Sequence, residues 1–467
     1  MNNDSYSKFI SSTDELVDDL SDIAGGSLTI SDAEFSSIDL RIGKIRSLLR
    51  AIEMKKKIVD ILETKNDTSD LPTNSKYYDQ DASQRKFCYE CKSKIRSDKF
   101  RHGIHRSMCI LCGNINMFKR DYKSNQTGKV AIVTGGRIKI GFETALSLLK
   151  NGATVIVTTR FVDDCFERFT KDDNFETFKN RLEIYQLNMM IESNINQFVK
   201  YIKERYDRID YLINNAAQTI RRPKEFYKHV IDKYDTFSLD NAPQIVNRNS
   251  QEIDYLLQAD ANINLYLENV DITVPRIMDV TEGNIKTEII PEVTKYFPPG
   301  QLDQFGQQID LRQINSWMLE LDLVSRKEFI EILIVNVVGP FILCQEFKDL
   351  MGFSNSDKLE NEYSWIINVT SMEGIFNWKF KPTRHPQTNI AKAALNMMTR
   401  TCGGHYIESG IVMVGVETGW NNSQQPDSYE RITPLDCKDG SARILDPIYR
   451  RLKQHSVIYK DYKIFDY

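Results

Sequence analysis

From Lys129 onward the sequence alternates short apolar runs with amphipathic segments, and this alternation constrains the fold more than any other feature. The apolar runs are rich in Val and Ile and lack the polar alternation of a strand that has one face in water. Strands of this kind are covered by helices on both faces. The sequence therefore predicts an α/β fold with a doubly wound parallel sheet, whose strands are KVAIVTGG, ATVIVTTR, LEIYQLNM, IDYLINNAA, SWIINVTS and IVMVGVETG.

One long stretch, at about 218–323, interrupts this alternation after the fourth predicted strand. It contains several prolines and many Asn, Asp and Gln residues. A structureless loop of that length is unusual in a compact domain. We therefore expect a large insertion that is a subdomain, a partner surface or partly disordered, with one helical segment at 250–270.

Residues 1–80 are predicted to be an N-terminal helical and linker region. The pattern of apolar residues favours an amphipathic helix between Ser36 and Lys65, which either packs on its own domain or docks on a partner. The apolar residues with alternating spacings of four and three are Ile38, Ile42, Ile45, Leu49, Ile52 and Val59.

Composition narrows the class of protein. The net charge of −4 over 467 residues argues against a nucleic-acid partner. The acidic, polar start lacks the features of a signal peptide or of a mitochondrial transit peptide, and the apolar run Ile330–Leu343 is too short and too polar to span a bilayer. We expect a cytoplasmic protein with no membrane association.

Four of the eight cysteines form two pairs, Cys88-x2-Cys91 and Cys109-x2-Cys112. Two such pairs can surround one ion with four thiolates, which suits structural zinc and leaves no open position for catalysis. We therefore predict a small zinc-binding module at 81–125, which serves as a staple, a protein-partner site or a weak nucleic-acid contact. The other four cysteines are predicted to be buried apolar fillers.

The run VAIVTGGRIKIGFETA turns from a strand into a helix, where free amides and the helix dipole suit a pyrophosphate. With the downstream motifs it resembles the short-chain dehydrogenase/reductase (SDR) superfamily, whose glycine motif reads TGxxxGxG. The matching residues lie within 129–217 and 324–467, and the cysteine module suggests a divergent eukaryotic subgroup. The residues that match the family motifs are Thr134, Gly135, Gly141, Asn214, Asn215, Ala216, Ala217, Asn336, Ser371 and Lys392.

The resemblance implies a Rossmann-type domain at 126–467 with a dinucleotide cofactor. Arg137, Lys139 and Arg160 would lie near the adenosine ribose, which favours NADP(H) over NAD, although they could also be solvated surface charges. Lys139 replaces the middle glycine of the motif, and Asn188 replaces the usual adenine-contacting Asp. The full cofactor-binding set is Thr134, Gly135, Arg137, Lys139, Ile140, Gly141, Arg160, Asn188, Asn215, Ala216, Lys392 and Thr418.

In the family, catalysis uses an Asn, a Ser, a Tyr and a Lys. The resemblance assigns Asn336 to the proton-relay water, Ser371 to the substrate carbonyl and Lys392 to the nicotinamide ribose, but Thr388 stands in place of the Tyr. An aliphatic hydroxyl is a much weaker acid than a phenol. His385, placed at a helix cap by Pro386, is the best substitute acid, and Glu373, two residues after Ser371, is a second candidate.

Three functions remain open. One is an NADP(H)-dependent oxidoreductase acting on a carbonyl/alcohol pair or an activated double bond. Another is a catalytically impaired pseudoenzyme that binds NADP(H) as a scaffold or sensor, with protein partners on the zinc module, the N-terminal helix or the insertion. A zinc-dependent adaptor is a third, narrower possibility. The resemblance also implies a homo-oligomer.

Overall fold

The structure is a computed structural model that describes residues 87–95, 101–233, 237–239, 242–248, 294–353, 362–377, 381–421, 424 and 433–465. The chain divides into two units, Met1–Lys76 and Tyr77–Tyr467, and every described residue belongs to the second. The predicted N-terminal helix and the predicted helix at 250–270 lie outside the described residues.

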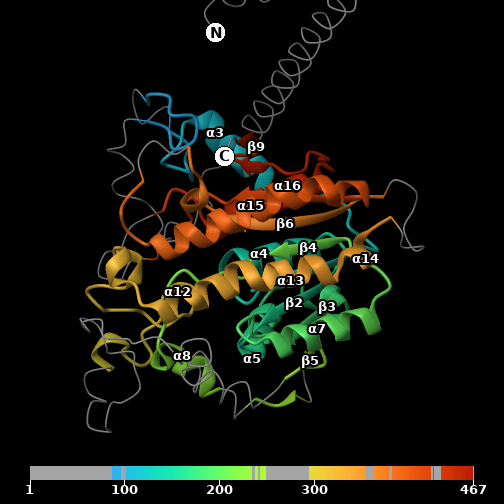
Figure 1. Cartoon of the computed structure of the whole chain (residues 1–467), viewed down its shortest axis with the longest axis horizontal. Coiled ribbons are helices and arrows are strands. Elements are labelled where there is room, and N and C mark those ends of the chain that lie inside the picture. Colours follow the sequence, from blue (N-terminus) through green and yellow to red (C-terminus); the bar gives the residue numbers. More distant parts are fainter. Residues whose placement is uncertain are drawn as a thin grey trace, which may run out of the picture. The chain divides into compact units, whose positions relative to one another are not determined.

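A single nine-stranded sheet organises this unit, in the order β5-β3-β2-β1-β4-β6-β7-β8-β9 (Figure 1). All neighbouring strands are parallel except β8 and β9. The predicted doubly wound parallel sheet is therefore confirmed, and the six predicted strands are β1–β4, β6 and β7. The strands are β1 (Val130–Thr134), β2 (Thr154–Thr159), β3 (Leu182–Gln186), β4 (Tyr211–Asn214), β5 (Ile245–Asn247), β6 (Ser364–Thr370), β7 (Ile411–Glu417), β8 (Ile458–Lys460) and β9 (Lys463–Phe465).

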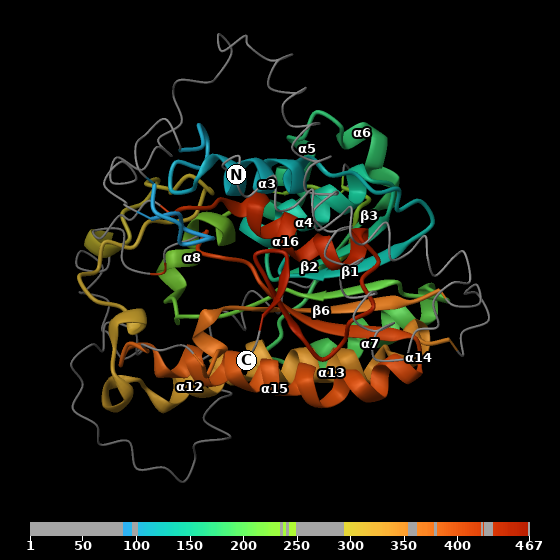
Figure 2. The same cartoon turned by 90° about the horizontal axis from the view of Figure 1, so that it is seen from above.

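Helices cover both faces of the sheet, as Figure 2 shows. One face packs against α4 (Lys139–Lys150), α5 (Val162–Thr170) and α16 (Cys437–Tyr449), with α3 (Ile110–Asp121) on the outside of α16. The other packs against α7 (Glu192–Arg205), α13 (Gly339–Glu346) and α15 (Pro386–Glu408). Because both faces are buried, the central strands carry apolar side chains on both sides.

Shorter elements join these layers. They are α6 (Phe175–Phe178), α8 (Lys224–Ile231), α12 (Arg326–Leu333), α14 (Lys348–Met351), the π-helical turn η9 (Ile334–Val338) and the 3-10 turns η4 (Lys179–Arg181), η7 (Ser316–Met318), η8 (Leu321–Leu323) and η10 (Met372–Gly374).

Part of the predicted insertion is integral to the sheet. Strand β5 lies within 218–323 and pairs in parallel with β3, with Ile184 opposite Ile245. Further along, the backbone carbonyl of Phe305 accepts a hydrogen bond of 2.7 Å from Arg168 of α5. The described parts of the insertion therefore pack on the domain, and β5 extends its sheet at the β3 edge.

The continuous helical stretch Arg326–Glu346 is long and apolar enough to cross a membrane, and it is the one such stretch among the described residues. It packs on the sheet instead, since Ile332 and Leu343 are fully buried within the domain. A core helix passes the same test of length and composition, so no membrane span is indicated.

Two glycines near the end of α15 should respond oppositely to substitution. Gly410 has φ +78°, and an added Cβ would lie 2.3 Å from the Phe353 ring, so Gly410→Ala should lower the free energy of unfolding by more than about 1 kcal/mol. Gly404 lies inside α15 with no atom within 4 Å of an added Cβ, so Gly404→Ala should raise it by about 0.5–1 kcal/mol. Urea denaturation of both variants checks this, and equal shifts would contradict the assigned backbone.

Candidate active site and metal centre

The turn after β1 is joined to the end of β4 by the hydroxyl group of Thr134. This buried Oγ1 donates to the carbonyl of Ile213 (3.2 Å) and accepts from the backbone amides of Asn215 and Ala216 (3.0 Å each). Gly135 follows with φ +66°, and an added Cβ would lie 2.8 Å from the Cα of Ala216. The carboxyl ends of two central strands are thereby held together at the place where ligands bind in sheets of this type.

A second set of contacts presents the N-terminus of α4 at this edge. The side-chain amide of Asn215 donates to the carbonyls of Thr134 (2.9 Å) and Gly135 (3.2 Å). An added Cβ on Gly141 would lie 2.4 Å from both the Asn215 amide and the Gly135 carbonyl, so only glycine fits. No side chain in the described part of the chain caps this helix, whose first residues are Lys139 and Ile140. Its amides are thus available to an anion.

Lys139 adopts a left-handed conformation, with φ +55°. Glycine is the residue that takes up this conformation without strain, which explains why the family motif has glycine here. The Lys139 side chain accommodates the change by extending over the ring of Phe305, 5.2 Å from its centroid. A side chain from the insertion therefore contacts the predicted phosphate turn.

The three cations predicted near the adenosine ribose differ in their surroundings. Arg137 is buried, with its guanidinium 2.6 Å from Asp164 and 2.7 Å from Gln307. This pairing competes with the predicted phosphate contact. Arg160 is half-buried and lies over the ring of Tyr227, at 4.9 Å from its centroid. The Arg160 guanidinium also donates to the Tyr227 hydroxyl at 3.1 Å.

Asn188, predicted to meet the adenine, follows β3 and is buried. Its Oδ1 accepts from the amide of Met190 (3.1 Å), while its Nδ2 has no hydrogen-bond partner among the described residues. A buried donor of this kind costs free energy until something accepts its proton.

Ser371 and Lys392 lie together at the same edge of the sheet. Ser371 follows β6 directly and occupies the N-cap position of η10. An added Cβ on Gly374 of this turn would lie 2.6 Å from the backbone carbon of Lys392. The buried Nζ of Lys392 donates to the carbonyl of Val369 (2.8 Å). Burial lowers the pKa of Lys392 to about 8, against a smaller opposing effect of Glu373.

Asn336 and Thr388 bind two consecutive carbonyls of the segment after β4. The Asn336 Nδ2 donates to Gln218 (2.7 Å), and the Thr388 hydroxyl donates to Thr219 (3.1 Å). Asn336 lies in the π-helical turn η9, a feature common at functional sites. The proton of the Thr388 hydroxyl is thus already donated to the backbone.

His385 caps α15, as predicted, with a left-handed backbone (φ 45°) and Pro386 at the first helical position. Its ring stacks on Trp317 of the insertion at 3.9 Å and 7°, and Nδ1 donates to the Trp317 carbonyl at 2.8 Å. Burial lowers the pKa of His385, so the ring is neutral at pH 7. The sequence could not predict this partner, because it comes from the irregular insertion.

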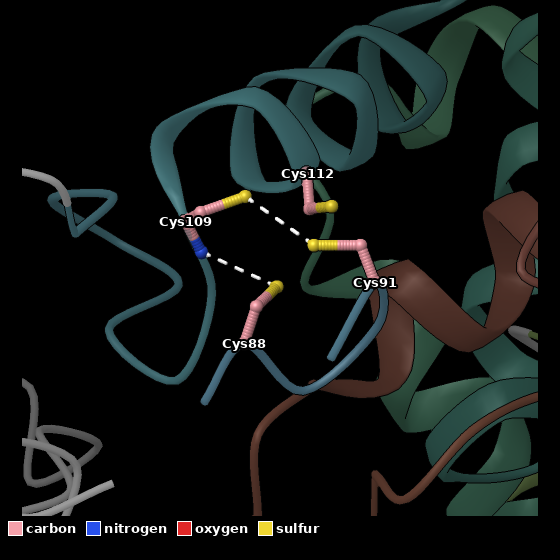
Figure 3. Close-up of side chains that lie close together, drawn as sticks. All are labelled: Cys88, Cys91, Cys109 and Cys112. Carbon is pink, nitrogen blue, oxygen red and sulfur yellow. Dashed lines mark hydrogen bonds between the residues drawn. The ribbon is translucent and has the colours of Figure 1, made fainter. Parts of the chain in front are cut away.

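The four predicted metal ligands converge from two segments, as Figure 3 shows. Their sulfur atoms all lie within 4.8 Å of one another, and those of Cys91 and Cys109 are 3.8 Å apart. Zn–S bonds of about 2.3 Å in a tetrahedron give an edge of about 3.8 Å. Cys109 and Cys112 lie at the start of α3, which fixes their half of the site.

The two histidines between the cysteine pairs have other partners. His102 Nδ1 accepts from the amides of Ile104 (3.3 Å) and His105 (2.9 Å), and His105 Nε2 lies 2.9 Å from Asp439 of α16. They are therefore not needed as ligands. The remaining cysteines behave as predicted, since Cys165, Cys344 and Cys437 are buried and Cys402 is partly so.

Sequence reasoning missed the ion pairs that join the cysteine module to α16. The buried Arg443 guanidinium lies 2.6 Å from Glu90, and Arg120 lies 3.0 Å from Asp436. Lys119 pairs with Asp446. These partners are hundreds of residues apart in sequence, so no local pattern reveals them.

Comparison with known proteins agrees with this geometry. Residues 129–239 match the family model for short chain dehydrogenases. This part of the chain is therefore similar to the short-chain dehydrogenase/reductase superfamily. The matched segment runs from β1 through β4 and includes the glycine turn and the Thr134 contacts.

Among sequence relatives, an uncharacterised protein of Acanthamoeba polyphaga mimivirus is 28% identical over 398 residues, which cover 80% of this chain and 74% of that protein. Retinol dehydrogenase 13 of Mus musculus is 37% identical over 95 residues, covering 20% of this chain and 28% of the enzyme. (+)-Neomenthol dehydrogenase of Capsicum annuum is 30% identical over 112 residues, covering 23% of this chain and 35% of the enzyme. The chain thus spans about a third or less of these two dehydrogenases.

Solved structures also resemble the chain. The Pseudomonas aeruginosa RhlG/NADP active-site complex matches with a TM-score of 0.38 and 16% identity, over 64% of this chain and 75% of that one. A short chain dehydrogenase from Salmonella enterica matches with a TM-score of 0.44 and 12% identity, over 73% of this chain and 99% of that one.

Replacing Thr134 should test the contacts at the carboxyl edge. Thr134→Val leaves the partly buried amides of Asn215 and Ala216 without their acceptor, which should lower the free energy of unfolding by about 2–4 kcal/mol. Thr144→Val is the matched control, because the Thr144 hydroxyl only donates to the Ile140 carbonyl of its own helix, and we expect a loss below about 1 kcal/mol. Urea denaturation measures both free energies of unfolding. Equal losses in the two variants would show that the Thr134 hydrogen bonds do not contribute more to stability than an ordinary buried threonine hydroxyl.

Proposed function

We propose that this protein is an NADP(H)-dependent oxidoreductase that reduces a carbonyl group or an activated double bond slowly. The observation that carries the proposal is the shared edge of the sheet. The glycine turn, Ser371 and Lys392 all lie at the carboxyl ends of parallel strands. The dehydrogenases among its sequence relatives support oxidoreductase chemistry.

The residues present fit a dinucleotide. The uncapped N-terminus of α4 suits the pyrophosphate, the unpartnered Nδ2 of Asn188 suits an adenine acceptor, and the Nζ of Lys392 suits the ribose hydroxyls. Thr418, buried just after β7, would lie beside the nicotinamide, which supplies a hydride when bound.

The proton is the difficult part of this chemistry. Thr388 donates to a backbone carbonyl and is a weak acid, and His385 is neutral and stacked. Lys392 is different, because a pKa of about 8 lets its ammonium give up a proton near neutral pH. We therefore assign the polarising hydroxyl to Ser371 and the proton to the Nζ of Lys392, with Asn336 ordering water nearby.

The hydrogen bonds of Thr388 and His385 also favour a second function. Because the side chains of Thr388 and His385 are engaged by Thr219 and Trp317, the domain could bind NADP(H) without turning it over. It would then act as a scaffold or sensor for a protein partner. Both functions require NADP(H) binding, so a protein that does not bind NADP(H) has neither. Only the oxidoreductase turns the cofactor over.

We propose that the four cysteines hold structural zinc. Their donor set and spacing suit this ion, and the closed shell leaves no position for substrate. Homo-oligomer formation, expected from the resemblance, stays a proposal.

The preference for NADPH should depend on Arg160. Arg160→Ala should weaken NADPH binding about 10- to 100-fold, because it removes a charged contact to the 2′-phosphate. NADH lacks that phosphate and serves as the control ligand, whose affinity should change less than twofold. Fluorescence titration measures both. Equal weakening of the two would show that Arg160 holds the adenine ring or the fold instead.

Stopped-flow oxidation of bound NADPH by a panel of aldehydes, ketones and activated alkenes tests the reaction itself. The rate should fall as pH rises through about 8, because the Lys392 ammonium is lost there. Ser371→Ala should slow it further, whereas His385→Ala should leave it unchanged. NADPH binding without oxidation by any member would support the pseudoenzyme, and no NADPH binding would exclude both functions.

A further inference from the structure

The two residues between Cys88 and Cys91 face the Rossmann-type domain. The Tyr89 hydroxyl accepts a hydrogen bond from the backbone amide of Trp420 at 2.8 Å. The Glu90 carboxylate accepts from Arg443 at 2.6 Å and from Asn116 at 2.8 Å. The loop that would wrap one side of the metal therefore contacts the rest of the protein through both of its central residues.

Trp420 belongs to a short segment, Thr418–Asn421, at the carboxyl end of β7. Its backbone leaves the strand at Gly419, which has φ +78° and where an added Cβ would lie 2.3 Å from Leu435 and 3.6 Å from the Tyr89 hydroxyl. Leu435 in turn packs in one small apolar cluster with Cys88, Cys112, Ile95 and Met108 of the cysteine module. The segment is thus packed against the module rather than against the sheet alone.

The same segment reaches the predicted phosphate turn. An added Cβ on Gly440, in the first turn of α16, would lie 2.7 Å from the Asn421 side chain and 3.0 Å from Ile140. The Asn421 side chain is buried and donates to the Thr418 carbonyl at 2.9 Å, which closes the segment on itself. Thr418–Asn421 therefore lies between the cysteine module and the turn that would hold the pyrophosphate.

We propose that the metal-bound cysteine module positions Thr418–Asn421 over the nicotinamide half of the cofactor, with Tyr89 as the positioning residue. The inference rests on the proposed nucleotide binding. A metal ion fixes the Cys88–Cys91 loop and hence the acceptor for the Trp420 amide. Release of the metal by chelation frees that loop and the segment together.

The Rossmann-type sheet does not depend on this contact. Its two large apolar clusters contain none of the four paired cysteines, and the module has a cluster of its own. Loss of the metal therefore loosens one edge of the cofactor site and leaves the sheet and the turn after β1 folded. The module thereby couples metal occupancy to the affinity for the nucleotide.

Tyr89→Phe in the full-length, zinc-loaded protein tests the inference, because it removes only the acceptor oxygen. Two measurements are made: hydrogen exchange of peptides covering Thr418–Asn421, and fluorescence titration with NADPH and with adenosine 2′,5′-bisphosphate, which lacks the nicotinamide half. We expect faster exchange at Thr418–Asn421 and two- to tenfold weaker NADPH binding, with unchanged zinc content and unchanged bisphosphate binding.

Tyr122→Phe is the matched control. Tyr122 also belongs to the module, but its ring packs against Tyr449 of α16, 6.3 Å between centroids. This variant should leave exchange at Thr418–Asn421 and both affinities unchanged. Chelation of zinc from the wild-type protein should weaken NADPH binding at least as much as Tyr89→Phe does, and again leave the bisphosphate unaffected.

The outcomes are distinguishable. Unchanged exchange in Tyr89→Phe, or equal weakening of both ligands, would overturn the positioning role. Unchanged NADPH affinity after zinc removal would overturn the coupling to the metal. If the wild-type protein binds neither ligand, the proposed function fails together with the nicotinamide part of the inference. The exchange rates still decide whether Tyr89 orders the segment.

Discussion

The hydroxyl group of Thr134 fixes the geometry on which both candidate sites depend. It joins the ends of β1 and β4 through three backbone groups, in the middle of a sheet whose strands are parallel. Because parallel strands end at one edge, this contact fixes the glycine turn relative to the elements that carry Ser371 and Asn336. The turn then places α4, whose residue Ile140 meets α16, and α16 carries the cysteine module.

The carboxyl edge of the sheet carries the residues that we assign to the proposed chemistry. Lys392 of α15 donates to the Val369 carbonyl, and Thr388, one turn earlier, donates to the Thr219 carbonyl. Thr388 and Asn336 hold two successive carbonyls of the segment after β4, and Trp317 covers His385. Burial of Lys392 leaves one group with a pKa near neutrality. The proposed oxidoreductase and the proposed pseudoenzyme therefore differ in whether the Lys392 ammonium can transfer a proton to the substrate.

The sheet, the glycine turn and the convergence of the four cysteines could be predicted from the sequence because each has a local pattern. Val- and Ile-rich runs mark strands buried on both faces, and x2 spacing marks a pair of thiolates. The pairing of Arg137 with Asp164, the stacking of Trp317 on His385 and the ion pairs of Glu90 and His105 could not be predicted. They join residues far apart in sequence, and several come from the insertion. The sequence predicted a zinc module at 81–125, and it gave no sign of the contacts through Tyr89 and α16 that join this segment to the Rossmann-type domain.

The structure of the zinc-loaded protein with NADPH tests the central claim most directly, because it locates the nucleotide relative to named atoms. We expect the pyrophosphate over the turn Gly135–Gly141 at the N-terminus of α4 and the 2′-phosphate beside Arg160. We expect the nicotinamide to lie between Ser371, Lys392 and the segment Thr418–Asn421. A nucleotide bound anywhere else, or a turn left empty at saturating NADPH, would contradict it.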